Sequence, residues 1–167
     1  MPELLRLLRA LAALARASLA PRWPRRTDCD ALLARLRDEL GPALTAAGGG
    51  LHGGSLPVVR ADARQLEHVF RILFGNALRH RGAEPPYLHV SARPAGREWL
   101  FALRDNGVGV DPQRHHEIFN AYSGATELPG CRRMVERHGG RMWVESARGH
   151  GATFYFSLPA TREVKHD

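Results

Sequence analysis

An aspartate followed by two spaced glycines is the stretch of this sequence whose chemistry is most informative. Asp105 follows the alternating run 99–103, which predicts a strand, and Gly107 and Gly109 come directly after it. Glycine permits positive φ and close approach of a ligand to the backbone, while a carboxylate accepts a hydrogen bond from an amine. The stretch 104–111 therefore indicates either a binding site for an amine-bearing ligand or an ordinary turn, since Asp-Asn-Gly is common in turns.

A long amphipathic helix upstream carries a polar residue beside its apolar face. Asp62 is expected to cap this helix, which is predicted to end near residue 81. Its apolar stripe is formed by Leu66, Val69, Phe70, Leu73 and Ala77. Asn76 lies next to that stripe, and a buried amide needs partners. Asn76 therefore favours either a hydrogen bond in the core or a contact with a ligand.

The remaining patterns predict an α/β protein with one sheet. Strands are expected at 56–59, 87–92, 97–104, 141–146 and 152–158, and further helices at 31–44, 112–121 and 129–138. The run 48–50 contains only glycine, so a flexible loop is expected after the helix 31–44. Gly139 should close the helix 129–138 in a left-handed conformation. The expected result is a two-layer α/β sandwich with helices 62–81 and 129–138 on one face of a mixed sheet.

Four further motifs accompany the 104–111 stretch along the chain. They lie at 65–81, 117–119, 135–146 and 149–154. In order and spacing, the five segments resemble the N, G1, F, G2 and G3 boxes of the ATP-binding domain of sensor histidine kinases. That domain belongs to a wider family shared with gyrase and Hsp90-type ATPases, and the likeness is greatest to phytochrome-type kinases. The resemblance covers roughly residues 55–160 and implies a Bergerat-type sandwich.

The resemblance implies a site for ATP and Mg²⁺. Its nucleotide-binding residues would be Asn76, Arg79, His80, Asp105, Gly107, Gly109, Leu128 and Thr153. Asp105 would accept a hydrogen bond from the adenine amino group, and the two glycines would shape the floor under the purine. Asn76 would hold Mg²⁺, which prefers oxygen ligands. Arg79 and His80 replace the lysine and aromatic residue usual in the family, and both would face the phosphates.

The G2 box departs from the family pattern. Kinases of this type carry a lid of about a dozen residues that ends in three spaced glycines, whose amides meet the triphosphate at a helix N-terminus. Here those glycines correspond to Ser123, Ala125 and Glu127, and only Leu128 matches. A carboxylate at Glu127 would repel phosphate by about 4 kcal/mol per close pair at an effective dielectric near 20. Pro129 also removes one amide donor.

Other residues limit the expected chemistry. Ile72 occupies a position that is often polar in the family, so no hydrolytic base and no catalytic residue are expected. Residues 1–51 contain no histidine, so the chain is not expected to be a self-contained autokinase. His138 is predicted to cap a helix or lie on the surface. The pair His115 and His116 lacks other metal ligands at useful spacing, so no metal is expected there.

Composition sets further bounds on the class of protein. The 167 residues, 44% hydrophobic and 25% charged, suffice for one domain with an appendage. The net charge of +7 comes almost wholly from arginine, since Lys165 is the only lysine, and the arginines are scattered over every predicted element. A nucleic-acid partner is therefore not expected. Cys29 and Cys131 suit a reducing, cytoplasmic compartment, and no apolar run predicts a membrane span.

A helical leader is expected before the domain. Residues 3–19 place leucines on a three-four spacing, and prolines at 21 and 24 interrupt the helix. The expected division is a leader at 1–27, a kinase-like domain at 28–160 and a tail at 161–167. The leader resembles the end of a kinase dimerisation hairpin, so it is expected either to form a homodimer through 3–19 or to cover its own domain.

Two functions fit these patterns. The absent lid, Ile72 and Glu127 favour a histidine-kinase-like protein of two-component signal transduction with a degenerate ATP site. Such a protein would dock to response-regulator or kinase partners, or relay phosphate among response regulators. The retained Asp105 and Asn76 favour the alternative, an active ATP-dependent kinase module that phosphorylates a histidine or serine of a partner in trans.

Overall fold

The computed structural model describes residues 25–120 and 127–161 of the protein. The strands within these residues are β1 (Arg25–Asp28), β2 (Gly50–Gly53), β3 (Val58–Ala61), β4 (Tyr87–Ala95), β5 (Glu98–Asp105), β6 (Met142–Ser146) and β7 (Ala152–Pro159). The helices are α2 (Cys29–Ala46), α3 (Ala63–Arg79) and α4 (Leu128–Arg137), together with the 3-10 turns η1 (Pro112–Arg114) and η2 (Glu117–Phe119).

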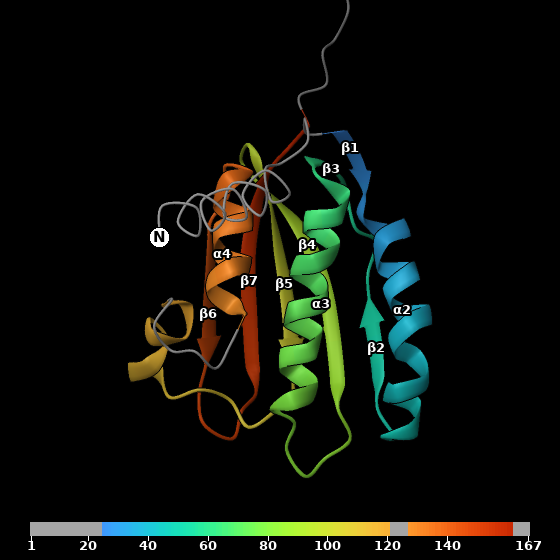
Figure 1. Ribbon diagram of the computed structural model, residues 1–167, viewed down its shortest axis with the longest axis vertical. Helices are drawn as coiled ribbons and strands as arrows, with labels where there is room; N and C mark the ends of the chain where they lie inside the picture. The colour runs from blue at the N-terminus through green and yellow to red at the C-terminus, as the bar shows by residue number, and fades with distance from the viewer. Residues whose placement is uncertain (1–24, 121–126, 162–167) are drawn as a thin grey trace, which may run out of the picture.

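A mixed five-stranded sheet forms the back layer of the molecule. Its strand order is β2-β4-β5-β7-β6; β2 runs parallel to β4, and the other neighbouring strands are antiparallel. β1 and β3 form a separate antiparallel pair. Figure 1 shows α2, α3 and α4 on the same face of the main sheet. The predicted two-layer sandwich, with helices on one face of a mixed sheet, is confirmed.

Helix α3 forms as its capping residue and apolar stripe predict. The Asp62 carboxylate accepts hydrogen bonds from the backbone N–H groups of Arg64 (3.0 Å) and Gln65 (3.4 Å), which satisfies two donors that the first turn leaves free. The whole predicted stripe is buried against the sheet. Asn76 lies one turn before the end of the helix, at the margin of this buried face.

Three phenylalanines join α3 to the centre of the sheet. Phe101 on β5 and Phe156 on β7 lie opposite each other in the strand register, with ring centroids 4.7 Å apart and nearly parallel planes. Phe70 of α3 meets the edges of both rings, at 6.3 Å from Phe101 and 5.7 Å from Phe156. All three side chains are completely buried, so this cluster fixes the helix over the strand β5 that leads to Asp105.

A histidine ties the end of α4 to the start of α3. His138 Nε2 accepts a hydrogen bond from the backbone N–H of Asp62 (3.0 Å), so Nδ1 carries the proton and donates to the carbonyl of Met134 (2.7 Å). Gly139 follows with a φ of 80°, the left-handed conformation expected at a helix end. His138 is therefore a capping residue, one of the two roles that the sequence predicts.

Two strands differ from the sequence prediction. β1 pairs with β3 from Arg25 onward, at residues where no strand is predicted. β2 lies where a flexible loop is predicted, and that prediction is wrong. The glycines before β2 have a packing role, because a Cβ at Gly49 would collide with the carbonyl oxygen of Pro86. Glycine here permits close backbone packing at the sheet edge.

The prediction of a single helix at 112–121 is also wrong. Within the described residues it consists of two separate 3-10 turns, η1 and η2. Asp111 caps η1 by accepting a hydrogen bond from the backbone N–H of Gln113 (2.9 Å). Between Gln113 and Asn120 only Ile118 and Phe119 are apolar, and two adjacent residues cannot form the repeating face that stabilises a longer helix.

The predicted leader helix 3–19 and residues 162–167 lie outside the described residues. Within the described part, no helix is long and apolar enough to cross a membrane.

Candidate functional site

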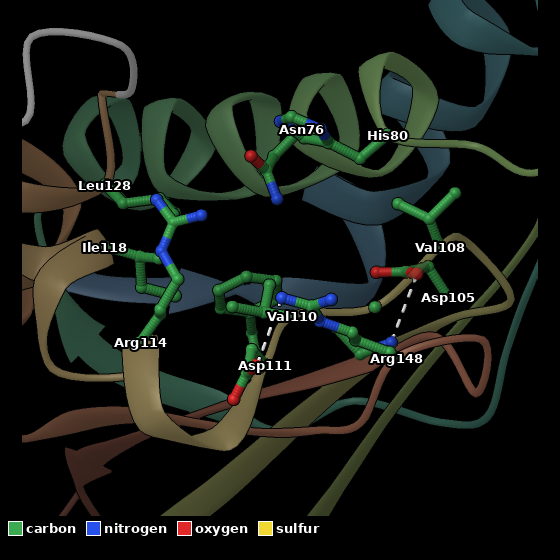
Figure 2. A pocket seen from close by; sticks show the side chains of 13 residues that line it. Asn76, His80, Asp105, Val108, Val110, Asp111, Arg114, Ile118, Leu128 and Arg148 are labelled. Carbon is green, nitrogen blue, oxygen red and sulfur yellow. Dashed lines mark hydrogen bonds and ion pairs between the residues drawn. The ribbon is translucent and has the colours of Figure 1, made fainter.

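A cavity of about 510 Å³ opens between α3 and the loop that follows β5 (Figure 2). It is lined by Asn76, His80, Asp105, Val108, Gly109, Val110, Asp111, Arg114, Ile118, Leu128, Arg148, Ala152 and Phe154. The cavity therefore has apolar walls and a few polar groups, as is usual for small-molecule sites.

Asp105 lies at one end of this cavity with only one of its oxygens engaged. Its Oδ1 accepts hydrogen bonds from the backbone N–H groups of Gly107 (2.8 Å) and Ala152 (3.2 Å). Its Oδ2 has no hydrogen-bond partner among the described residues. Burial raises the pKa of Asp105, while the two amides and the nearby His80 act in the opposite direction. The free oxygen is thus an oriented acceptor at the end of the cavity.

Asn76 and His80 line the cavity from the last turn of α3. Figure 2 shows the Asn76 amide projecting from the helix into the cavity, across from Asp105 and Val108. The Asn76 side chain is half-buried and forms no hydrogen bond with another described residue. The backbone carbonyl of His80 accepts from the N–H of Val108 (3.0 Å), which holds the loop after β5 against the helix end.

Both glycines after Asp105 are required by the backbone around them. At Gly107, a Cβ would collide with the carbonyl oxygen of His80 and lie 2.9 Å from Asp105 Oδ1. Gly109 has a φ of 71°, and a Cβ there would overlap the carbonyl oxygen of Ala147. The two positions therefore bring the loop into contact with α3 on one side and with the turn between β6 and β7 on the other.

Replacing Gly109 with alanine is expected to destabilise the fold by about 2–4 kcal/mol, because left-handed strain and a backbone collision act together. Chemical denaturation followed by circular dichroism measures this change. Gly96→Ala is the matched control, since Gly96 also has positive φ (65°) but no atom within 4 Å of its Cβ position. It should cost only about 1–2 kcal/mol. Equal losses for the two variants would contradict the proposed collision.

Two arginines that the sequence patterns do not single out also line the cavity. Arg148, from the turn before β7, forms an ion pair with Asp111 (3.1 Å), and Arg114, from η1, pairs with Glu117 (3.1 Å). Both arginine side chains are mostly exposed, so these pairs hold them only weakly. The two guanidinium groups provide cationic donors at the mouth of the cavity, while Asp105 provides an acceptor inside it.

This arrangement fits a ligand with a flat, amine-bearing end and an anionic end. The model of the histidine kinase-, DNA gyrase B- and HSP90-like ATPase family matches residues 61–162, a range that holds every residue lining the cavity. The chain belongs to this ATPase family. Membership implies ATP binding, and the family resemblance seen in the sequence is confirmed.

Relatives of this ATPase domain include phytochromes and sensor kinases. Cyanobacterial phytochrome A of Nostoc sp. is 37% identical over 143 residues, which cover 80% of this chain and 19% of that protein. The methanogenesis regulatory histidine kinase FilI of Methanothrix harundinacea is 35% identical over 112 residues, covering 62% of this chain and 13% of the relative. The chain thus spans about a fifth or less of these relatives.

Solved structures confirm the ATPase fold. The catalytic domain of histidine kinase ThkA superposes with a TM-score of 0.74 at 18% identity, covering 83% of this chain and 97% of that domain. Full-length ShkA in complex with AMPPNP gives a TM-score of 0.72 at 24% identity, covering 84% of this chain and 32% of ShkA.

The structure brings five of the eight predicted nucleotide-binding residues of the ATPase domain together. Asn76, His80, Asp105, Gly109 and Leu128 line the cavity. Arg79 is exposed at the end of α3 and does not line the cavity. Gly107 is buried against the backbone of His80 and does not line the cavity either. Thr153 lies on β7 between two lining residues, so strand alternation turns its side chain to the other face of the sheet.

The altered G2 box is only partly within the described residues. Ser123 and Ala125 lie outside them. Glu127 is exposed just before α4 and does not line the cavity, whereas the next residue, Leu128, is buried and does. Pro129 occupies the first turn of α4. The first turn of this helix thus has one amide donor fewer for an anionic ligand.

The two cysteines of the ATPase domain lie in its core. Both cysteines are free and buried, and burial raises the pKa of Cys29 to about 12 and that of Cys131 still further. Neither thiol is therefore an activated nucleophile. Among the described residues, no group of three or more His, Cys, Asp or Glu side chains is placed to hold a metal ion.

Proposed function

We propose that this chain is the nucleotide-binding module of a histidine-kinase-like protein in two-component signal transduction, with a retained adenine site and a weakened triphosphate site. The observation that carries this proposal is the free Oδ2 of buried Asp105 at the end of an apolar cavity. An acceptor held in that way suits the exocyclic amine of adenine.

The walls of the cavity suit a purine. Val108, Val110, Ile118, Leu128 and Phe154 supply apolar surface next to Asp105. A flat base would gain contact with these side chains while its amine pairs with the carboxylate. Base recognition in this proposal therefore needs no residue from the lid region.

The phosphate end has fewer built-in contacts. Asn76, whose amide has no described partner, would supply an oxygen ligand to Mg²⁺ accompanying the phosphates. Arg114, Arg148 and His80 would approach phosphate from the cavity mouth. The start of α4 should bind phosphate only weakly. Glu127 places a negative charge there, and Pro129 lacks the backbone N–H that could donate to a phosphate oxygen.

The proposed cellular role is docking to kinase or response-regulator partners, or relay of phosphate among response regulators. ThkA, which shares the fold, has been solved in complex with the response regulator protein TrrA. A homodimer through residues 3–19 is part of the same proposal.

The alternative is an active kinase module that acts in trans on a partner. The observation in its favour is the pair of arginines at the cavity mouth, which offers phosphate contacts that the sequence patterns do not reveal. If the contacts to the phosphates were intact, the affinity for a nucleotide would depend strongly on the number of its phosphate groups.

Titration calorimetry with ATP, ADP and adenosine, each with and without Mg²⁺, tests the proposal. We expect the affinities for ATP, ADP and adenosine to agree within about tenfold, because the phosphate contacts are weak. In a site with intact phosphate contacts, each charge-assisted contact would contribute about 1.5–3 kcal/mol and would separate the three affinities further. Glu127→Gln should raise ATP affinity by roughly two- to fivefold, because exposed charges interact weakly, and should leave adenosine affinity unchanged.

Two outcomes would count against the proposal. Mg²⁺-ATP binding far tighter than adenosine binding, lost in Asn76→Ala, would show an intact clamp and favour the active kinase. Failure of all three ligands to bind would remove the nucleotide-binding role itself.

A further inference from the structure

A second cavity, of about 450 Å³, lies at the end of the sheet where β5 leads into the Asp105 loop. Its polar lining consists mainly of nitrogen-bearing side chains from separate segments, with Asp105 as the one carboxylate. His52 comes from β2, His89 from β4, Arg104 from β5 and His150 from the turn before β7. Arg104 and His150 fall within the 104–111 and 149–154 segments, but none of the four side chains is among the proposed nucleotide contacts.

Strand register places three of these side chains in one row. His52 is the partner of His89 in the parallel pair β2–β4, and His89 is the partner of Arg104 in the antiparallel pair β4–β5. Partners across strands point to the same face of a sheet. The alternate residues of β4 and β5, Leu88 and Leu103, are buried beneath the helices, so the row lies on the face that carries no helix.

The carboxylate that shares this row is Glu145, which Thr153 separates from Arg104. None of the ion pairs among the described residues includes His52, His89, Arg104 or His150. Arg104 is a permanent cation on the exposed face of β5, so solvent or an anion must offset its charge. The one carboxylate that lines this cavity, Asp105, is engaged through Oδ1 with backbone amides.

An exposed aromatic ring borders the same cavity. Tyr87 is one of the two large apolar side chains that remain exposed among the described residues, at 49% of its surface. Its ring is stacked on that of His52, with centroids 6.2 Å apart and planes 23° apart. The Tyr87 backbone is held by Asn106, whose Oδ1 accepts from its N–H (2.8 Å) and whose Nδ2 donates to the Pro85 carbonyl (2.9 Å).

We propose that this cavity binds a small phosphate monoester carried on a planar ring. Arg104 and the histidines supply donors suited to the phosphate oxygens, and the exposed Tyr87 ring supplies a flat surface for the ring of the ligand. The site is distinct from the nucleotide cavity, because it lies on the other face of the sheet and is lined by Tyr87, His89 and Arg104. Asp105 and its loop separate the two.

Phenyl phosphate titrated into the full chain, followed by the NMR signals of the histidine rings, tests this proposal. We expect saturable binding that shifts the His52, His89 and His150 signals. Arg104→Gln should weaken it at least about tenfold, the loss typical of a charge-assisted hydrogen bond. His89→Gln should weaken it in the same direction. Inorganic phosphate should bind more weakly than phenyl phosphate to the wild-type chain, and Tyr87→Ala should narrow that difference.

Arg93→Gln is the matched control, since Arg93 is an exposed arginine on the same face of β4 and does not line the cavity. It should leave the affinity within about twofold of wild type. Equal weakening by Arg93→Gln and Arg104→Gln would reduce the effect to general surface charge and overturn the proposal. The proposal also fails if neither Arg104→Gln nor His89→Gln changes the affinity for phenyl phosphate. Loss of binding in Asn76→Ala would likewise contradict it, because phenyl phosphate would then occupy the nucleotide cavity.

Discussion

Replacing Asp105 with asparagine is expected to lower the affinity for adenosine and ATP by about a hundredfold, because a donor would then face the adenine amine. The asparagine oxygen can keep both backbone hydrogen bonds that Oδ1 now accepts, from Gly107 and Ala152. Its amide nitrogen then takes the place of the free Oδ2. Calorimetric titration measures the loss, and the same fractional loss for both ligands is expected because the change is at the base end.

The Asp105→Asn variant should remain folded. The pH dependence of its stability, compared with that of the wild-type protein, is a control whose direction can be predicted. Burial raises the pKa of Asp105 in the folded state, so the protonated form stabilises the wild-type fold. That contribution is fully present below the unfolded-state pKa and is lost as pH rises through the higher folded-state pKa. Asp105→Asn should remove this decline, so its stability relative to wild type should increase over the same pH window. Unchanged nucleotide affinity in a folded variant would rule out Asp105 as the base acceptor.

Replacing Phe156 with alanine is expected to reduce the free energy of unfolding by about 3–5 kcal/mol, which approaches the whole stability of a small domain. Phe156 is completely buried between β5 and α3, and its ring meets both Phe101 and Phe70. Truncation leaves a cavity that neighbouring strands cannot easily fill. Urea denaturation of the full chain, with the midpoint and slope both recorded, checks the prediction.

Tyr155→Ala is the matched control for this core substitution. Tyr155 is the neighbour of Phe156 on β7, but it lies on the face without helices, stacked on Trp143 at 5.3 Å. Its loss should cost about 1–2 kcal/mol, since part of the ring is already in contact with solvent. A cost for Phe156→Ala no greater than that for Tyr155→Ala would show that the phenylalanine cluster is not the centre of the core.

The fold was predictable wherever side-chain periodicity records burial. Phe70 and its neighbours on α3 repeat every three or four residues, and Phe101 and Leu103 on β5 alternate with less buried residues, because each element buries one face. β2 was not predictable in this way. Its sequence is Gly-Leu-His-Gly, and its position depends on backbone pairing with β4 and on close packing of Gly49 against Pro86.

The site was predictable at its base end and less so at its mouth. Asp105 and Asn76 follow directly from a strand-to-glycine junction and from a polar residue beside an apolar stripe. Arg114 and Arg148 come from irregular segments, where no period fixes the direction of a side chain, and arginine is abundant throughout the chain. Three-dimensional proximity alone distinguishes these two arginines from the others.

The position of β7 between β5 and β6 has a consequence for how the chain folds during synthesis. β5 is paired on both sides in the finished sheet, and one of its partners, β7, ends at Pro159, more than fifty residues later in the chain. Until that segment has left the ribosome, one edge of β5 is unpaired, and Phe70 and Phe101 lack Phe156, the third ring of their cluster. We therefore expect the nascent domain to acquire its stable core in one late step, and to depend on protection from aggregation until then.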